Sequence, residues 1–82
     1  MATYETLLVD RPRAGITVAT LNRPDRRNAL SFQAFKDLFR LSQEIAADEA
    51  TRVLILTGAG RGFCAGLDLE DASTLPNMTA SI

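Results

Sequence analysis

The feature that most constrains this chain is the continuous apolar run Val53–Thr57 (VLILT). If this run is a strand, neither of its two faces carries a charged side chain. A run of Leu and β-branched residues is typical of a strand that is buried on both faces, as strands of parallel sheets are. Such a strand needs a layer of structure packed against each side of its sheet. Any fold of this chain must therefore account for two covering layers.

The residues before this run predict a hairpin. Tyr4–Asp10 places Leu7 and Val9 among polar neighbours and is expected to form a strand. Arg11–Gly15 contains a proline and a glycine, which favour a turn. Ile16–Leu21 has the composition and spacing of a second strand, which we expect to pair antiparallel with the first.

Helical spacing follows. Ser31 is suited to be the N-cap, because its hydroxyl can accept a hydrogen bond from a first-turn amide, and Phe32–Asp48 is predicted to be a helix. Its apolar stripe is expected to face the core; a ligand groove is the less favoured alternative. The stripe consists of Phe35, Leu38, Phe39, Ser42, Ile45 and Ala46, and the opposite, polar face of Lys36, Asp37, Arg40, Gln43 and Glu44.

The predicted elements supply only one of the two layers. A strand, a helix and a parallel strand imply a right-handed crossover, with the helix on one side of the sheet. Residues 71–82 contain no pattern for a complete element that could cover the other side. A chain of 82 residues also buries only about 60% of its unfolded surface. We therefore expect the N-terminal portion of a larger domain, or a piece that borrows surface from a partner.

Composition excludes several classes of function. The net charge is −1, whereas a nucleic-acid-binding protein carries a basic excess. No apolar run approaches the length needed to span a membrane. Histidine is absent and Cys64 is the single cysteine, which excludes a Ser-His or Cys-His dyad and most zinc sites within the chain. We expect no metal site, no nucleic-acid or membrane partner, and a cytoplasmic location.

Positive charge is nevertheless concentrated near the N-terminus. Residues 1–27 hold five arginines against three acidic residues, which gives +2, so the remaining residues sum to −3. The pattern is compatible with an anion site near Arg23–Arg27 and equally with a solvated loop.

The glycine-rich segment Gly58–Leu69 (GAGRGFCAGLDL) directly follows the apolar strand. Ligands of open α/β folds bind beyond the carboxyl ends of strands, and glycine lets the backbone approach a ligand closely. No lysine completes a Walker loop, Phe63 stands where a dinucleotide fingerprint needs glycine, and no serine forms a nucleophile elbow. The remaining interpretations are a site of backbone-amide donors, suited to an oxyanion, or a plain tight turn.

Two motifs together carry a family resemblance. Asn22–Leu30 (NRPDRRNAL), followed after about thirty residues by Gly58–Leu69, resembles the crotonase superfamily of enoyl-CoA hydratases and isomerases. The resemblance implies an α/β, crotonase-like fold, that is, a ClpP/crotonase spiral of ββα units, incomplete in this chain. Residues 1–82 would then be the N-terminal part of a single crotonase-like domain whose remainder is absent.

The resemblance also implies a site that binds an acyl-CoA or enoyl-CoA thioester. The backbone N–H of Leu67 would be the first oxyanion-hole donor, and the Ala65 carbonyl would accept from the adenine amine. Asp68 could instead be only a helix cap, and Cys64 a packed small side chain. Coenzyme A is part of the substrate, and no separate cofactor is expected. The implied substrate-binding set is Arg26, Arg27, Ala29, Ala65, Gly66, Leu67, Asp68 and Leu69.

The implied activity of a complete family member is hydration of 2-enoyl-CoA, with a homotrimer or hexamer expected. The second oxyanion donor and the catalytic acids of the family lie beyond this segment, so the chain alone is expected to be inactive. Isomerisation, dehalogenation or thioester hydrolysis remain alternative reactions, and a non-catalytic CoA-binding or subunit-interaction fragment remains an alternative role. The acidic residues that do not match the family's catalytic positions are Glu44, Glu49, Glu70 and Asp71.

Overall fold

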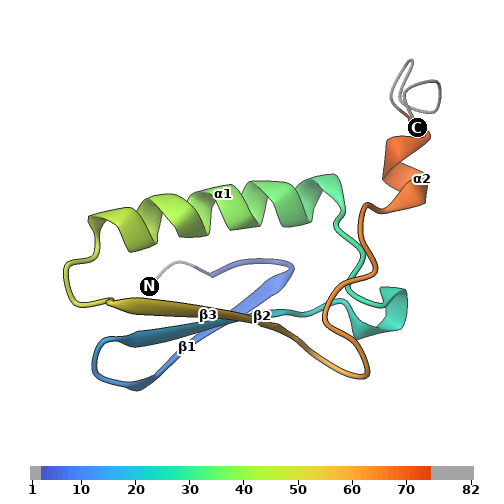
Figure 1. Cartoon of the computed structure of the whole chain (residues 1–82). Coiled ribbons are helices and arrows are strands. Elements are labelled where there is room, and N and C mark those ends of the chain that lie inside the picture. The colour runs from blue at the N-terminus through green and yellow to red at the C-terminus, as the bar shows by residue number, and fades with distance from the viewer. Residues whose placement is uncertain (1–2, 75–82) are drawn as a thin grey trace.

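One long helix lies across one side of a three-stranded sheet in the computed structural model, which describes residues 3–74 (Figure 1). The glycine-rich segment leaves the sheet at one end and leads into a short second helix. The elements are β1 (Leu7–Arg13), β2 (Ile16–Leu21), the 3₁₀ turn η1 (Pro24–Arg26), α1 (Phe32–Ala47), β3 (Val53–Gly58) and α2 (Leu69–Ala72).

The sheet has the order β1-β2-β3. β1 pairs antiparallel with β2, and β2 pairs parallel with β3 from Ile16↔Val53 to Leu21↔Gly58. The predicted hairpin and the predicted strand–helix–strand unit are therefore confirmed. No complete element was predicted in residues 71–82; the first two of these residues belong to the short helix α2 (Leu69–Ala72). Residues 75–82 lie outside the described part of the chain.

The boundaries predicted for β1 were wrong. The strand starts at Leu7 and continues through Pro12 to Arg13, where a turn was predicted. Proline is tolerated there because β1 is an edge strand of the described sheet, and the register shifts between Asp10 and Arg13. The turn itself is limited to Ala14 and Gly15.

Helix α1 begins as predicted. The Ser31 hydroxyl accepts a hydrogen bond from the Ala34 amide at 3.1 Å, and the helix ends at Ala47, one residue before the predicted end. This cap fixes the start of the helix directly after the loop that contains Asn22–Leu30.

The face that α1 turns to the sheet differs from the predicted one. Phe35 and Phe39 are 46% and 64% exposed, whereas Leu41, which was not assigned to the stripe, is buried. Both sets of residues have helical spacing, so periodicity alone could not choose between them. The smaller Ala34 is buried and Phe35 remains outside. The side chains of α1 that are buried or packed against the core are Ala34, Leu38, Leu41 and Ile45.

The prediction that Asp37 lies on the polar face was also wrong. Its carboxylate is fully buried and accepts hydrogen bonds from the Thr6 amide at 2.9 Å and the Thr6 hydroxyl at 2.7 Å. Gln33 donates a third hydrogen bond at 2.9 Å. Burial by itself would raise the pKa of Asp37, but these hydrogen bonds outweigh it and the pKa is lowered. The ionised carboxylate thus ties α1 to the segment that leads into β1.

The core lies between α1 and the β1–β2 hairpin. Thr17, Ala19 and Leu21 alternate toward it on β2, and the apolar members of the main cluster are Tyr4, Leu7, Ala19, Leu21 and Leu41. Burial raises the pKa of Tyr4 to about 12.

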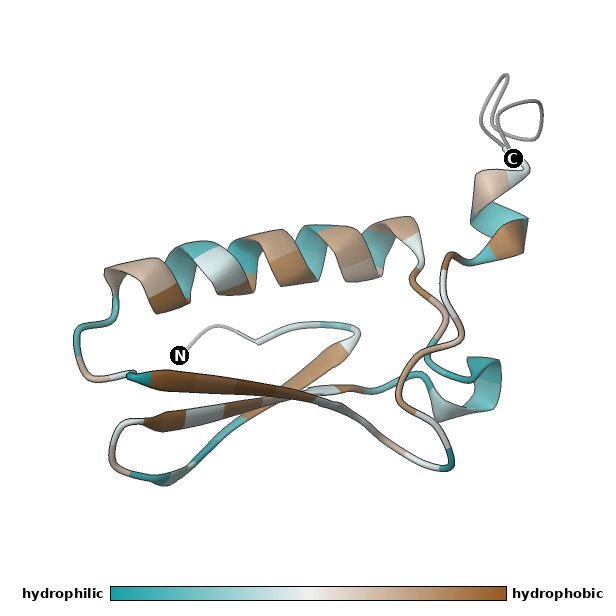
Figure 2. Ribbon diagram, viewed as in Figure 1, coloured by the Kyte–Doolittle hydropathy of each residue, from teal (hydrophilic) through white to brown (hydrophobic). Residues whose placement is uncertain are grey.

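Strand β3 is not covered on both faces within the described residues. Val53–Leu56 remain 41–51% exposed and form the apolar edge strand of the sheet (Figure 2). In the register, Val53 lies beside Ile16 and Ile55 beside Val18, on the face opposite the buried side chains of β2. The predicted need for a second layer is thus visible as an open apolar face.

Replacing Asp37 with alanine should lower the free energy of unfolding by about 2–3 kcal/mol, because it leaves two Thr6 donors unpaired in the interior. The folded pKa lies below the unfolded value of about 3.9, so the stabilisation is complete above that pH and is lost as pH falls below it. Urea unfolding between pH 7 and pH 2 measures both effects. Lys36→Ala, at an exposed neighbouring position, is the control; equal losses in the two variants would contradict the assignment.

Candidate functional site

Two loops form the candidate site at the end of the sheet where β2 and β3 finish. The arginine loop (Asn22–Leu30) follows β2, and the glycine loop (Ala59–Asp68) follows β3; they lie side by side (Figure 1). Backbone hydrogen bonds hold the glycine loop in place: the Ala59 amide donates to the carbonyl of Leu21, the last residue of β2, at 2.8 Å, and the Ala65 amide donates to the Arg27 carbonyl of the arginine loop at 3.0 Å. The parallel pairing of β2 and β3 therefore brings both motifs to one edge.

Asn28 is the main side-chain link between the loops, and sequence analysis gave it no role. Its side chain is 2% exposed, and its amide nitrogen donates to the Ala59 carbonyl at 2.8 Å and the Gly62 carbonyl at 2.9 Å. Its side-chain oxygen accepts from the Arg23 amide at 2.8 Å. Asn28 has a φ of 56°, a region that asparagine tolerates better than most residues. The partners that define its role lie more than thirty residues away in the sequence.

The glycine loop folds back against the end of β3, and this close approach depends on Gly58. A Cβ at this position would stand 2.7 Å from the Gly62 carbonyl oxygen and closer still to that of Phe63. Only glycine permits this approach of backbone to backbone. The Asn28 side chain reaches Ala59 and Gly62 because the loop folds back so tightly.

Leu30 and Leu67 form an isolated parallel bridge between the two loops. The Leu30 amide donates to the Gly66 carbonyl at 2.7 Å, and the Leu30 carbonyl accepts from the Asp68 amide at 2.9 Å. The Gly66 carbonyl and the Leu67 N–H belong to one planar trans peptide, so they point in opposite directions. The Leu67 N–H is therefore directed away from Leu30 and, within the described part of the chain, donates to no acceptor.

Gly66 adopts a φ of +98° immediately before this peptide. A side chain is strained at such an angle, so glycine is required for the orientation of the Leu67 amide. The Gly66 amide donates to the Cys64 sulfur at 3.3 Å, and Cys64 packs partly buried against the core. This placement agrees with the prediction that Cys64 is a packed small side chain.

Asp68 is the N-cap of α2, one of the two interpretations offered by its sequence. Its side chain, 4% exposed, accepts from the Glu70 amide at 2.9 Å and the Asp71 amide at 3.4 Å. Arg23 lies 3.2 Å from the second carboxylate oxygen. Burial alone would raise the pKa of Asp68, but the Asp71 amide, Arg23, the Glu70 amide and the charge of Arg26 together lower it.

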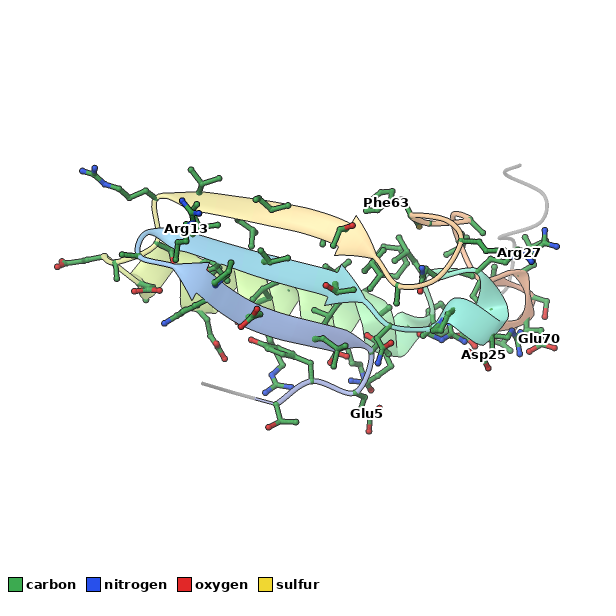
Figure 3. All side chains as sticks on the ribbon, turned by 90° about the horizontal axis from the view of Figure 1, so that it is seen from below. Glu5, Arg13, Asp25, Arg27, Phe63 and Glu70 are labelled. Atoms are coloured by element: carbon green, nitrogen blue, oxygen red, sulfur yellow. The ribbon has the colours of Figure 1, made fainter. Side chains whose placement is uncertain are left out.

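Arg26 and Arg27 have different surroundings. The Arg26 guanidinium pairs with Glu70 at 2.7 Å, which raises the pKa of Arg26 further. Arg27 lies instead on a cleft of about 660 Å³ between the two loops. In Figure 3 both Arg27 and Glu70 lie at the end of the molecule opposite Arg13. The cleft is lined by Pro24, Asp25, Arg27, Ala59, Gly60, Arg61, Gly62, Cys64 and Ala65.

The structure thus divides the residues implied by the resemblance into two groups. Arg27 and Ala65 line the cleft, together with Arg61, which sequence analysis did not single out. Ala29, whose carbonyl accepts from Arg23 at 2.5 Å, belongs with the residues of the bridge and the α2 cap. The members of that second group are Arg26, Ala29, Gly66, Leu67, Asp68 and Leu69, the last of which is 74% exposed.

Two other kinds of site are absent from residues 3–74. No three His, Cys, Asp or Glu side chains in this part of the chain gather closely enough to hold a metal ion. None of its helices has both the length and the apolar character needed to cross a bilayer.

The sequence matches the family described as enoyl-CoA hydratase/isomerase over residues 11–81, which includes both loops of the site. The chain belongs to the enoyl-CoA hydratase/isomerase family. It is 39% identical over 77 residues to the probable enoyl-CoA hydratase EchA12 of Mycobacterium tuberculosis, covering 94% of this chain and 27% of that protein. It is 44% identical over 66 residues to the 1,2-epoxyphenylacetyl-CoA isomerase of Escherichia coli, covering 80% of this chain and 25% of that protein.

Solved structures of family members have the same fold over the matched part of this chain. The enoyl-CoA hydratase of Bacillus anthracis superposes with a TM-score of 0.85 at 32% identity, covering 94% of this chain and 30% of that one. The predicted α/β, crotonase-like fold is confirmed by these neighbours. This family member spans about a quarter of the length of the curated relatives, corresponding to their N-terminal part.

Asn28→Asp should lower the free energy of unfolding of this family member by about 2 kcal/mol, because it replaces two donors with acceptors facing the Ala59 and Gly62 carbonyls. Thermal and urea unfolding measure the loss. Asn22→Asp, in the same loop at an exposed position, is the matched control. If both variants unfold at the wild-type midpoint, Asn28 does not link the loops.

Proposed function

We propose that the chain provides the CoA-thioester-binding part of an enoyl-CoA hydratase, the enzyme that adds water to a 2-enoyl-CoA. In this proposal the Leu67 N–H is one donor of an oxyanion hole, and the cleft beside Arg27 receives the nucleotide end of coenzyme A. The names of the relatives support the substrate class, since they include several enoyl-CoA hydratases and a CoA-thioester isomerase.

The observation that carries the proposal is the state of the Gly66–Leu67 peptide. Its carbonyl is occupied by the Leu30 amide at 2.7 Å, and its N–H is left without an acceptor in residues 3–74. A carbonyl that accepts a hydrogen bond polarises its own peptide and makes the attached N–H a stronger donor. A fixed, polarised N–H of this kind suits a thioester oxygen that gains charge as the enolate forms.

The cleft supplies the chemistry expected for coenzyme A. Arg27 and Arg61 approach it from the two loops, and guanidinium groups bind phosphates by charge and by paired hydrogen bonds. Ala65 also lines the cleft, and its carbonyl accepts no hydrogen bond within the described residues, which leaves it available to an adenine amine. Ala65, which lines the cleft, is only two residues before Leu67 in the sequence. One extended ligand could therefore reach both the cleft and the Leu67 N–H.

Proton transfer would depend on groups outside the matched segment. The acids nearest Leu67 are engaged: Asp68 caps α2, Glu70 pairs with Arg26, and Asp71 accepts from the Phe32 amide at 2.8 Å. The general acid and base would thus lie in the part of the relatives' length that this chain does not span. Isomerisation of a CoA thioester is a second candidate reaction, favoured by the 44% identity to the Escherichia coli isomerase.

The proposal extends to the setting of the enzyme. A homotrimer or hexamer in the cytoplasm, with no cofactor beyond the coenzyme A of the substrate, remains the expectation for a complete family member. A non-catalytic role in CoA binding or subunit contact is the alternative, favoured by the open apolar face of β3.

Binding to the ¹⁵N-labelled chain, followed by amide NMR, tests the proposed site. But-2-enoyl-CoA should shift the Leu67 amide downfield, because its N–H gains an acceptor, while coenzyme A without an acyl group should shift only the residues around the cleft. Binding without any Leu67 response to the thioester would remove Leu67 as the donor. Absence of binding at millimolar concentrations of both ligands would contradict the whole proposal.

Arg27→Ala should weaken the binding of coenzyme A about tenfold, the typical loss of one charge-assisted contact. Arg26→Ala, whose guanidinium pairs with Glu70 outside the cleft, should change the dissociation constant less than threefold. Calorimetric titration measures both values. The reverse order would show that the phosphates bind at Arg26 instead.

A further inference from the structure

Arg23 makes two separate side-chain contacts between the loops, and the proposed function uses neither. Its two terminal nitrogens donate to different acceptors, the Ala29 carbonyl at 2.5 Å and the Asp68 carboxylate at 3.2 Å. The Arg23 backbone is itself held, because its amide donates to the Asn28 side chain at 2.8 Å. The guanidinium therefore sits as a fixed brace between the arginine loop and the start of α2.

Both acceptors of Arg23 adjoin the bridge that orients the Leu67 amide. Ala29 immediately precedes Leu30, whose backbone bonds to Gly66 and Asp68, and Asp68 immediately follows Leu67. A shift of Asp68 relative to Ala29 would thus rotate the Gly66–Leu67 peptide. Two kinds of contact set the distance between Ala29 and Asp68: the backbone hydrogen bonds of Leu30 and the side-chain hydrogen bonds of Arg23.

The Asp68 carboxylate needs this partner. It is 4% exposed, so removal of Arg23 would leave a carboxylate deprived of its closest cation in a site that water hardly reaches. Arg26 lies farther away, at 3.9 Å from the other carboxylate oxygen, and is held by Glu70. The Asp68 side chain would have to move toward Arg26 or solvent, and the Leu67 peptide would move with it.

We infer that Arg23 is a positioning residue, which holds the Leu67 N–H in the direction of a bound thioester carbonyl through its simultaneous contacts with Ala29 and Asp68. The inference rests on the proposed function, since it assigns to Arg23 the orientation of the same donor. Arg23 is not among the residues that line the cleft, and its guanidinium donates instead to Ala29 and Asp68. Its loss should therefore affect the acyl end of the ligand and spare the nucleotide end.

Arg23→Gln tests this separation in the ¹⁵N-labelled chain. The dissociation constant for coenzyme A should stay within threefold of wild type, and the shifts of Arg61 and Ala65 should persist. The additional Leu67 shift caused by but-2-enoyl-CoA should fall by at least half. Arg13→Gln, at the opposite end of the molecule from Arg27 (Figure 3), should retain that shift because Arg23 still braces Asp68.

Arg23→Lys provides a second, milder variant, since a single ammonium group cannot reproduce two donors aimed at different acceptors. It should retain part of the Leu67 response, between that of wild type and that of Arg23→Gln. A full wild-type Leu67 response in either folded variant would overturn the inference while leaving the proposed function intact. Unfolding of both variants would also overturn it, by making Arg23 a folding residue. A wild-type chain in which Leu67 never responds would instead refute the proposed function.

Discussion

The backbone of Leu30 holds the candidate site together. Its amide and carbonyl bond to Gly66 and Asp68, on either side of Leu67, and so connect two segments more than thirty residues apart in sequence. Because a peptide is planar, the occupied Gly66 carbonyl fixes the opposite direction of the Leu67 N–H. The other features of the site serve this arrangement: the φ of Gly66, the cap formed by Asp68, and the brace formed by Arg23.

The sheet explains why the two loops meet. β2 and β3 run parallel in register to their last residues, so the segments that follow them leave from the same edge. Asn28 then joins the loops through two backbone carbonyls, and Gly58 lets the second loop return close enough to be reached. The apolar strand β3 therefore determines where the two loops of the candidate site lie. Its uncovered face, which includes Val53 and Ile55, is consistent with a chain that spans about a quarter of its relatives' length.

Much of this arrangement follows from the sequence. The apolar run, the hairpin and the Ser31 cap are local signals, and each specifies its own element. The orientation of α1 is different, because Phe35 and Leu41 are equally compatible with helical spacing and only packing against β1 and β2 decides between them. Asp37 was misassigned for a related reason: a charged side chain can be buried when distant donors, here those of Thr6, satisfy it. The roles of Asn28 and Arg23 likewise depend on partners about thirty to forty-five residues away, which no local pattern reveals.

We propose that the Leu67 N–H is a free, oriented donor for a thioester carbonyl. Infrared difference spectroscopy of but-2-enoyl-CoA labelled with ¹³C at the thioester carbonyl, bound to the chain, tests it most directly. A hydrogen bond from Leu67 predicts that the carbonyl stretch of the bound ligand moves to lower frequency than in water-free solvent, and that Leu67→Pro, which removes the N–H, abolishes the shift without preventing coenzyme A from binding. An unshifted carbonyl in the wild-type complex, or an equal shift in a folded Leu67→Pro variant, would contradict the account.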